Sequence, residues 1–247
     1  MKSVLKWGSL CLVVYFIFLI VNLPAVHVLS KIQLAKGVSV SGISGTIWNG
    51  HAQRAQVNGL PINDLNWSLS FFPLLLGEVS ADIKAGNIRD AGEISATGLV
   101  SLSGQRVQVE NLLAYLPANL AINLLPLPIP IKADGRFKVQ LDEVDYAAGC
   151  QTFTGNGQWL NANFTGVTGV IELGNFAAVL SCQDRNIVLD VKQPNSFGLT
   201  AKATIPINMK FKITGRFKPQ VSLPKEVHQA AQFFGKADAD GYYPIKF

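Results

Sequence analysis

Most of the chain after residue 30 alternates apolar and polar residues, and this pattern limits the possible folds more than any other feature. Residues 136–144, 185–192 and 208–218 each carry apolar side chains at every second position, as half-buried β-strands do. An Asn58-Gly59 step between two extended runs is a strong β-hairpin signal. Strands of this kind have one apolar and one polar face, so their sheet must be covered on one side or curl over its own apolar face. The pattern predicts a mainly β domain built on a strongly curved, largely antiparallel sheet.

Helical patterns are few and short. Residues 71–77 and 109–117 are each predicted to form about two turns beside the sheet, and residues 223–235 have the clearest helical spacing of apolar residues. A final strand is expected after this last helix. Residues 125–132 have proline at every second position, which predicts a sheet edge or an extended linker.

The first part of the chain predicts a membrane anchor. Lys2 and Lys6 precede residues 7–23, which carry no charge, and the apolar run on to Leu29 can complete a crossing of roughly 30 Å. A cleaved signal peptide is the alternative, but no pair of small residues marks a cleavage site after the apolar segment. The two lysines predict a cytoplasmic N-terminus and an exported remainder.

Two of the three cysteines lie in the exported part. Cys150 and Cys182 allow one disulfide, which would stabilise the domain by about 3 to 4 kcal/mol and fits an oxidising compartment. Two buried thiols remain an alternative, and a metal site is disfavoured because neither cysteine has a second ligand at a suitable spacing. We therefore expect residues 1–29 to form the cytoplasmic tip and anchor, and residues 30–247 to form one β-rich domain.

Catalytic signatures are missing from the sequence. The net charge is +5, but the basic residues are scattered along the strands, which indicates solvated faces and argues against nucleic acid. His27, His51 and His228 have no acidic or cysteine neighbours at ligand spacing, and no G-x-S-x-G motif occurs. We expect no enzymatic activity, no catalytic residue, no cofactor and no metal site.

The stretch "GISGTIWNG" at residues 42–50 is the one candidate motif. Gly45 and Gly50 are expected where a strand bends or needs a positive φ, and Trp48 is expected to anchor the first curl of the sheet. A structural role is the first interpretation, and contact with a protein partner is the second.

Taken in order, several segments resemble one known family. They are the apolar N-terminal segment, "GISGTIWNG", "NWSLSFFPLLLGEVSADI", "IKADGRFKVQLDEVDY", the cysteine pair and the closing "FGKADADGYYPIKF". Together they resemble protein N of the bacterial type II (general) secretion system over nearly the whole chain. The resemblance implies a single-pass inner-membrane protein of a Gram-negative cell, with a periplasmic β-rich domain.

The same resemblance implies an accessory role in the export of folded proteins across the outer membrane. The expected partners are other components of the secretion system, together with inner-membrane lipid. The strand pattern suggests docking in the periplasm through sheet edges, or through exposed apolar side chains near "LPLPIPI" at residues 125–131. Gly45, Trp48 and Gly50 match the family's opening motif, Cys150 and Cys182 match its cysteine pair, and no catalytic residue carries over. The alternative is a membrane-anchored groove that binds lipid or lipopolysaccharide, which requires an apolar face left open over a long stretch.

Overall fold

The computed structural model describes residues 2–31, 36–122, 132–167, 169–207 and 212–246. These described residues form one antiparallel sheet of 13 strands in which every strand pairs with its neighbours in the chain, in the order β1 to β13. The strands are β1 (Val38–Gly45), β2 (Asn49–Val57), β3 (Leu60–Leu69), β4 (Val79–Ala85), β5 (Ser95–Ser103), β6 (Arg106–Pro117), β7 (Ala133–Tyr146), β8 (Cys150–Thr165), β9 (Val170–Gln183), β10 (Asn186–Lys192), β11 (Thr200–Ile205), β12 (Lys212–Phe217) and β13 (Tyr243–Lys246). The predicted mainly β, antiparallel fold is confirmed.

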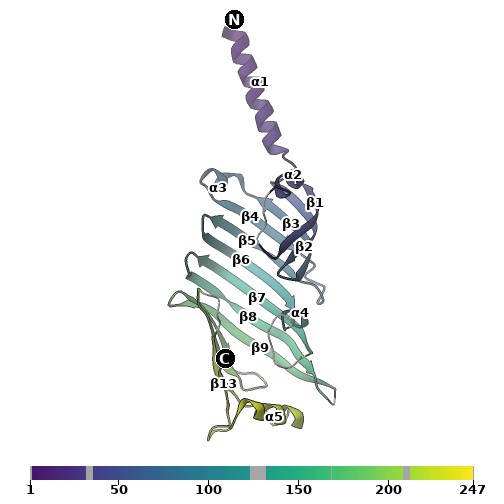
Figure 1. Ribbon diagram of the computed structural model, residues 1–247, viewed down its shortest axis with the longest axis vertical. Helices are drawn as coiled ribbons and strands as arrows, with labels where there is room; N and C mark the ends of the chain where they lie inside the picture. The colour runs from purple at the N-terminus through teal and green to yellow at the C-terminus, as the bar shows by residue number, and fades with distance from the viewer. Residues whose placement is uncertain (1, 32–35, 123–131, 168, 208–211, 247) are drawn as a thin grey trace.

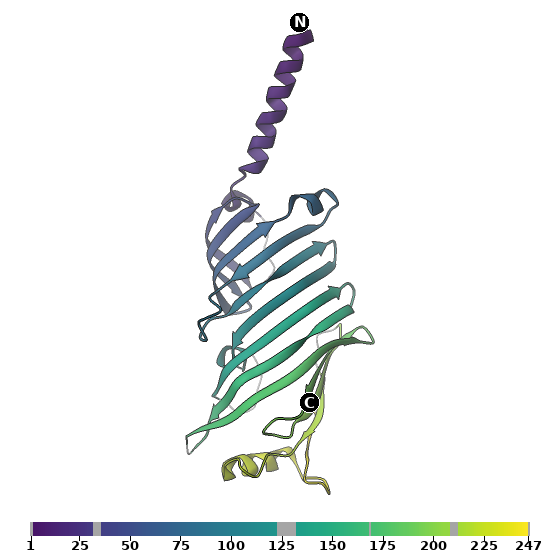
Figure 2. The ribbon, with the colours of Figure 1, turned by 180° about the vertical axis from the view of Figure 1, so that it is seen from behind.

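The helices lie at the ends and margins of this sheet. They are α1 (Lys2–Val21), α2 (Ala25–Leu29), α3 (Phe71–Leu75), α4 (Ala118–Ile122), α5 (Lys225–Ala231) and the 3-10 helix η1 (Gln232–Phe234). Figures 1 and 2 show the strands stacked along the long axis of the molecule, with α1 projecting from one end and α5 at the other. The sheet is open, because β1 and β13 are its two edges.

The N-terminal helix ends earlier than the sequence pattern predicts. It stops at Val21, and Pro24 precedes the separate short helix α2, whose first residue, Ala25, is fully buried. Proline removes a helical hydrogen bond and restricts the residue before it, so the apolar run after Pro24 does not lengthen α1. Among the described residues, we find no helix whose length and apolar character would suffice to span a membrane.

Local sequence explains most of the strands. The Asn58-Gly59 step forms the tight turn between β2 and β3, with φ of 50° at Asn58 and 87° at Gly59. Both central residues of this turn need a positive φ, which asparagine and glycine adopt at low cost. The hairpin predicted at this step is confirmed.

One predicted helix is wrong, because residues 109–117 belong to β6. The strand has an extra residue next to Asn111, where φ is 51° and the register with β5 shifts. This bulge puts Val109 and Leu112 into the same apolar cluster although they are three residues apart. Three-residue spacing also occurs on a helix face, so the bulge imitates a helical pattern.

The other two predicted helical segments and the final strand agree with the prediction, whereas the sequence pattern does not predict α4 (Ala118–Ile122). The segment 71–77 contains α3, the segment 223–235 contains α5 and η1, and β13 follows them. Gly235 directly follows η1 with φ of 113°, which suits a glycine at a helix end. The proline-rich segment 125–132 lies, except for Lys132, outside the described residues.

The apolar side chains share one face of the sheet, which we call the apolar face. Leu141, Val144 and Leu180 form a buried cluster on it that is lined by strand residues alone. A second cluster lies where α5 covers the far end of this face, with Val227 packed beside Phe176. Directly paired aromatic side chains lead into it, with ring centroids 5.3 Å apart for Phe137 and Trp159 and 5.7 Å apart for Trp159 and Phe176.

Candidate functional site

The glycine-rich motif forms the tight connection between β1 and β2. Gly45 ends β1 with φ of 80° and pairs with Gly50 in β2. A Cβ atom on Gly45 would lie 2.6 Å from the carbonyl oxygen of Asn49, which is too close for any side chain. The backbone therefore requires glycine at position 45 for both its φ and its space.

Gly50 gives room to an aromatic ring of the next strand. It lies opposite Trp67 of β3, and a Cβ atom at position 50 would come within 2.1 Å of Cζ2 of that ring. The indole Nε1 of Trp67 donates a hydrogen bond of 3.1 Å to the carbonyl oxygen of Ile47, inside the motif. Trp67 thus lies over Gly50 and is tied to the β1–β2 turn.

Trp48 connects the N-terminal helix to the sheet. Its indole Nε1 donates a hydrogen bond of 2.8 Å to the carbonyl oxygen of Ile20, in the last turn of α1. The same oxygen accepts the amide of Leu23 at 3.3 Å. The ring of Trp48 packs against the ring of Phe71 in α3, with centroids 5.4 Å apart. One half-buried side chain therefore touches both α1 and α3.

Backbone contacts strengthen the same joint. The amide of Ile47 donates to the carbonyl oxygen of Leu23 at 3.0 Å, and Pro24 forms an isolated antiparallel bridge with Thr46. The motif therefore holds the end of α1 and the start of α2 against the first hairpin of the sheet. We call this arrangement of residues 20–24 and 45–50 the helix–sheet joint.

The joint borders a shallow hollow of about 410 Å³ on the sheet. Its lining includes Gly45 and Gly50 together with His51, Asn66 and Lys84. The Nδ1 atom of His51 lies 3.1 Å from the amide oxygen of Asn66. Among the described residues that line the hollow, no serine or cysteine is hydrogen-bonded to this imidazole. The hollow is lined mostly by polar side chains.

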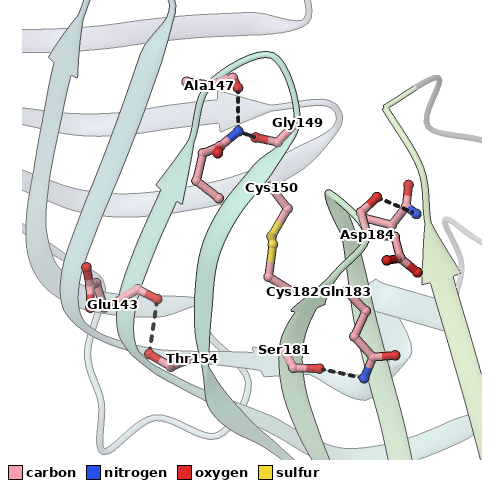
Figure 3. Close-up of a disulfide and its surroundings, with 11 residues drawn as sticks. Glu143, Ala147, Gly149, Cys150, Thr154, Ser181, Cys182, Gln183 and Asp184 are labelled. Carbon is pink, nitrogen blue, oxygen red and sulfur yellow. Dashed lines mark hydrogen bonds between the residues drawn. A yellow bond between two sulfur atoms is a disulfide. The ribbon is translucent and has the colours of Figure 1, made fainter.

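Cys150 and Cys182 form a disulfide between β8 and β9. Figure 3 shows the bond joining Cys150 to Cys182, whose Cα atoms are 5.9 Å apart. Cys150 is 2% exposed, and its amide donates to the carbonyl oxygen of Arg185 beyond the end of β9. The bond thus fastens the β8–β9 pair at the end where β8 begins and β9 finishes. Cys11 is a free cysteine on α1.

A salt bridge lies close to this end of β8. Arg106, at the start of β6, donates from Nε to Oδ1 of Asp145 at 2.8 Å and from Nη2 to Oδ2. The hydrogen bonds from Arg106 lower the pKa of the Asp145 carboxyl group, and its partial burial opposes that effect. The pair connects the start of β6 to the end of β7, and the Asp145 side chain is 12% exposed.

The remaining candidate residues do not come together. His27 lies in α2, His51 in β2 and His228 in α5, so they belong to separate parts of the fold. Within the described residues, we find no group of three or more histidine, cysteine, aspartate or glutamate side chains arranged to hold a metal ion.

Two residues that contact the joint lie outside the glycine-rich motif. Trp67 is hydrogen-bonded to Ile47 and Phe71 packs against Trp48, but both residues come from a later stretch of the chain. A signal for Trp67 does exist in the sequence. The Asn58-Gly59 turn fixes the register of the hairpin, and counting outward from it places Trp67 opposite Gly50.

Comparison with known proteins gives one family. The family profile described as type II secretion system (T2SS), protein N, matches residues 36–246 of the chain. Type II secretion system protein N of Vibrio cholerae serotype O1 is 29% identical over 252 residues, covering 99% of this chain and 98% of the relative. The protein of the same name from Aeromonas hydrophila is 28% identical over 254 residues, covering 100% of this chain and 98% of the relative.

A third relative, from Pectobacterium carotovorum subsp. carotovorum, carries the same name and is 25% identical over 249 residues, covering 100% of this chain and 97% of its own. No solved structure matches the chain. None of these names mentions a lipid, so the comparisons give no support to the alternative of a lipid-binding groove.

Proposed function

Because the chain belongs to the family of type II secretion system protein N, we propose that it is an accessory component of a type II secretion system. In this role it takes part in the export of folded proteins across the outer membrane by docking other components in the periplasm. The function is a binding one and needs no catalytic residue. The process is tested by deleting the gene and measuring secretion of a folded exoprotein; unchanged secretion in every growth condition would contradict it.

The contrast between the two edges of the sheet carries the docking proposal. β13 is a four-residue edge that contains Pro244 and Lys246, and both residues discourage the addition of another strand. β1 is an eight-residue edge, "VSVSGISG", without proline or charge. An edge of this kind offers its backbone groups to an incoming strand, as in recognition by β-strand addition. The proposed docking edge is therefore β1.

Site-specific crosslinking tests this edge. A photoreactive residue in place of Ser39, which is exposed on β1, should crosslink to another component in the cell envelope. The same residue in place of Lys246, on the opposite edge, should give little or no crosslink. Equal crosslinking at the two edges, or crosslinking at Lys246 alone, would contradict docking through β1.

A charge substitution provides a functional test of the same edge. Ser41→Lys places a lysine on β1 and should reduce secretion at unchanged protein level, because edge lysines oppose strand addition. Gln158→Lys adds the same charge to an exposed position of β8, which already pairs on both sides, and should leave secretion unchanged. Normal secretion by Ser41→Lys would argue against strand addition as the mode of docking.

We further propose that α1 anchors the protein in the inner membrane, with a cytoplasmic N-terminus and a periplasmic sheet. Every described large apolar side chain from Leu10 to Val21 is at least 44% exposed, an arrangement that favours an apolar surrounding over water. Lys2 and Lys6 precede these residues, and excess positive charge marks the cytoplasmic side. The disulfide fits an oxidising compartment for the sheet.

Fusions to reporter enzymes test this topology. Alkaline phosphatase is active only in the periplasm, so a fusion after Phe247 should be active, and a fusion of a cytoplasmic reporter at the same point should be inactive. The opposite pair of results, or release of the protein by alkaline carbonate washing of membranes, would contradict the anchor.

A further inference from the structure

The short helix α3 exposes a continuous run of large apolar side chains. Phe71, Phe72, Leu74, Leu75 and Leu76 are 48%, 79%, 39%, 68% and 87% exposed, and Pro73 is the remaining residue of the run. No polar side chain interrupts the segment from Phe71 to Leu76. Grouped apolar exposure of this kind marks a contact surface, whereas singly scattered apolar residues need no explanation. We call residues 71–76 the α3 patch.

The α3 patch lies at the end of the sheet from which α1 projects, as both ribbon views show (Figures 1 and 2). Trp48 links the two elements through its ring contact with Phe71 and its hydrogen bond to the carbonyl oxygen of Ile20. The patch is therefore continuous with the helix–sheet joint, beside the point where α1 leaves the sheet. A membrane that surrounds α1 would therefore lie next to the α3 patch.

The backbone of the α3 patch is suited to a poorly hydrated surrounding. The amides of Leu76 and Glu78 donate to the carbonyl oxygen of Pro73, and the amide of Gly77 donates to that of Leu74. Pro73 itself has no N–H group. Unpaired backbone groups are costly where water is scarce, and this turn pairs the amides of Leu76, Gly77 and Glu78 within itself. Both the side chains and the backbone of the patch are thus compatible with the boundary between headgroups and acyl chains.

We propose that the α3 patch is a second membrane contact, in which Phe72, Leu75 and Leu76 enter the phospholipid leaflet next to α1. The inference rests on the proposed anchoring of α1. The partner is a lipid surface, because the patch is uncharged and borders the apolar helix. One helix alone lets an attached domain swivel about it, whereas two contacts set the direction in which the sheet extends from the membrane.

Fluorescent labelling of the full chain in phospholipid vesicles tests this contact. In a Cys11→Ser background with the Cys150–Cys182 disulfide intact, Leu75→Cys is labelled with the environment-sensitive dye NBD. Spin-labelled lipids in the vesicles should quench this dye several-fold more strongly than the same dye at Val221→Cys, which is 94% exposed near α5. Equal quenching at the two positions would overturn the proposal.

A label on α1 separates this inference from the anchoring itself. Ile17→Cys carries the dye on the exposed surface of α1 and should be quenched strongly. Strong quenching at position 17 with none at position 75 would refute the α3 contact and leave the anchor in place. No quenching at position 17 would refute the anchor. A dye at position 75 that is shielded from aqueous iodide but not quenched by lipid would assign the patch to a protein neighbour and overturn the proposal.

A matched pair of charge substitutions completes the test. Phe72→Asp should reduce lipid quenching at position 75 several-fold and leave quenching at position 17 unchanged, because the carboxylate withdraws the patch from the leaflet. Phe233→Asp alters a phenylalanine of similar exposure in η1, at the other end of the sheet, and should change neither signal. Unchanged quenching at position 75 in Phe72→Asp would contradict membrane insertion of the patch.

Discussion

Replacing Gly50 with alanine tests the packing of the helix–sheet joint. The added Cβ would lie 2.1 Å from Cζ2 of Trp67, whereas carbon atoms in contact are about 3.5–4.0 Å apart, so the indole must move by more than about 1 Å. Overpacking of this kind costs about 1–3 kcal/mol. Loss of the bond from Trp67 to the carbonyl oxygen of Ile47 adds about 1 kcal/mol. We expect Gly50→Ala to lower the free energy of unfolding by about 2–4 kcal/mol.

Gly157 in β8 provides the matched control. Neither Gly50 nor Gly157 has a positive φ, and both are half-buried strand residues. A Cβ atom on Gly157 would meet only Cβ of Ala178, at the ordinary distance of 3.9 Å. Gly157→Ala should therefore be neutral or stabilising by up to about 1 kcal/mol, since alanine restricts the unfolded chain more than glycine does.

Thermal and urea unfolding of the full chain in detergent, followed by far-ultraviolet circular dichroism, measures the difference. For a chain of this size a loss of 2–4 kcal/mol corresponds to a fall of roughly 4–16 °C in Tm. In a Trp67→Leu background, Gly50→Ala should cost much less, because the ring that it strikes is gone. Equal stabilities of Gly50→Ala and Gly157→Ala, or an unchanged cost in the Trp67→Leu background, would refute the packing account.

Three further perturbations have defined outcomes. Trp48→Phe keeps a ring beside α3 but loses the indole donor to α1. It should lower the free energy of unfolding by about 1 kcal/mol and speed proteolysis between α1 and the sheet. A stable, abundant variant that fails in secretion would instead indicate a partner contact. Replacing both Cys150 and Cys182 by alanine should lower the free energy of unfolding in urea by about 3–4 kcal/mol, and the reduced wild type should match this variant. The lowered pKa of Asp145 stabilises the folded state fully above about pH 4, and this stabilisation is lost as the pH falls through the lowered pKa. Asp145→Asn should therefore lose less stability on acidification than the wild type does. Equal acid sensitivity of the wild type and Asp145→Asn would show that the pairing of Asp145 with Arg106 contributes nothing measurable.

The strands are the part of the fold that the sequence predicts best. The Asn58-Gly59 turn and the alternation in β7 and β10 are local signals, and each strand pairs only with its neighbours in the chain. Local turns and alternation are therefore sufficient to predict such a sheet. The same locality explains the failure at residues 109–117, where a bulge beside Asn111 changes the spacing of apolar residues from two to three. A bulge leaves no clear signal in one strand, because it is defined by the partner strand.

The helix–sheet joint could be predicted only in part. The backbone needs of Gly45 can be inferred from the motif, and Trp67 could have been placed from the hairpin register. The hydrogen bond from Trp48 to Ile20 could not be predicted from the sequence, because it depends on where α1 ends and how the chain turns at Pro24. Contacts between a helix end and a turn follow from three-dimensional placement and have no fixed spacing in the sequence.

The order of the strands determines where a partner strand can extend the sheet. The first hairpin of the sheet carries the joint, and β1, an outer edge of the sheet, ends in it at Gly45. A partner strand added to β1 would therefore extend the sheet next to the proposed membrane contacts of α1 and the α3 patch. The proline and lysine of β13 make growth from the other edge unfavourable. Assembly from the β1 edge alone would give each bound partner one defined orientation relative to the membrane.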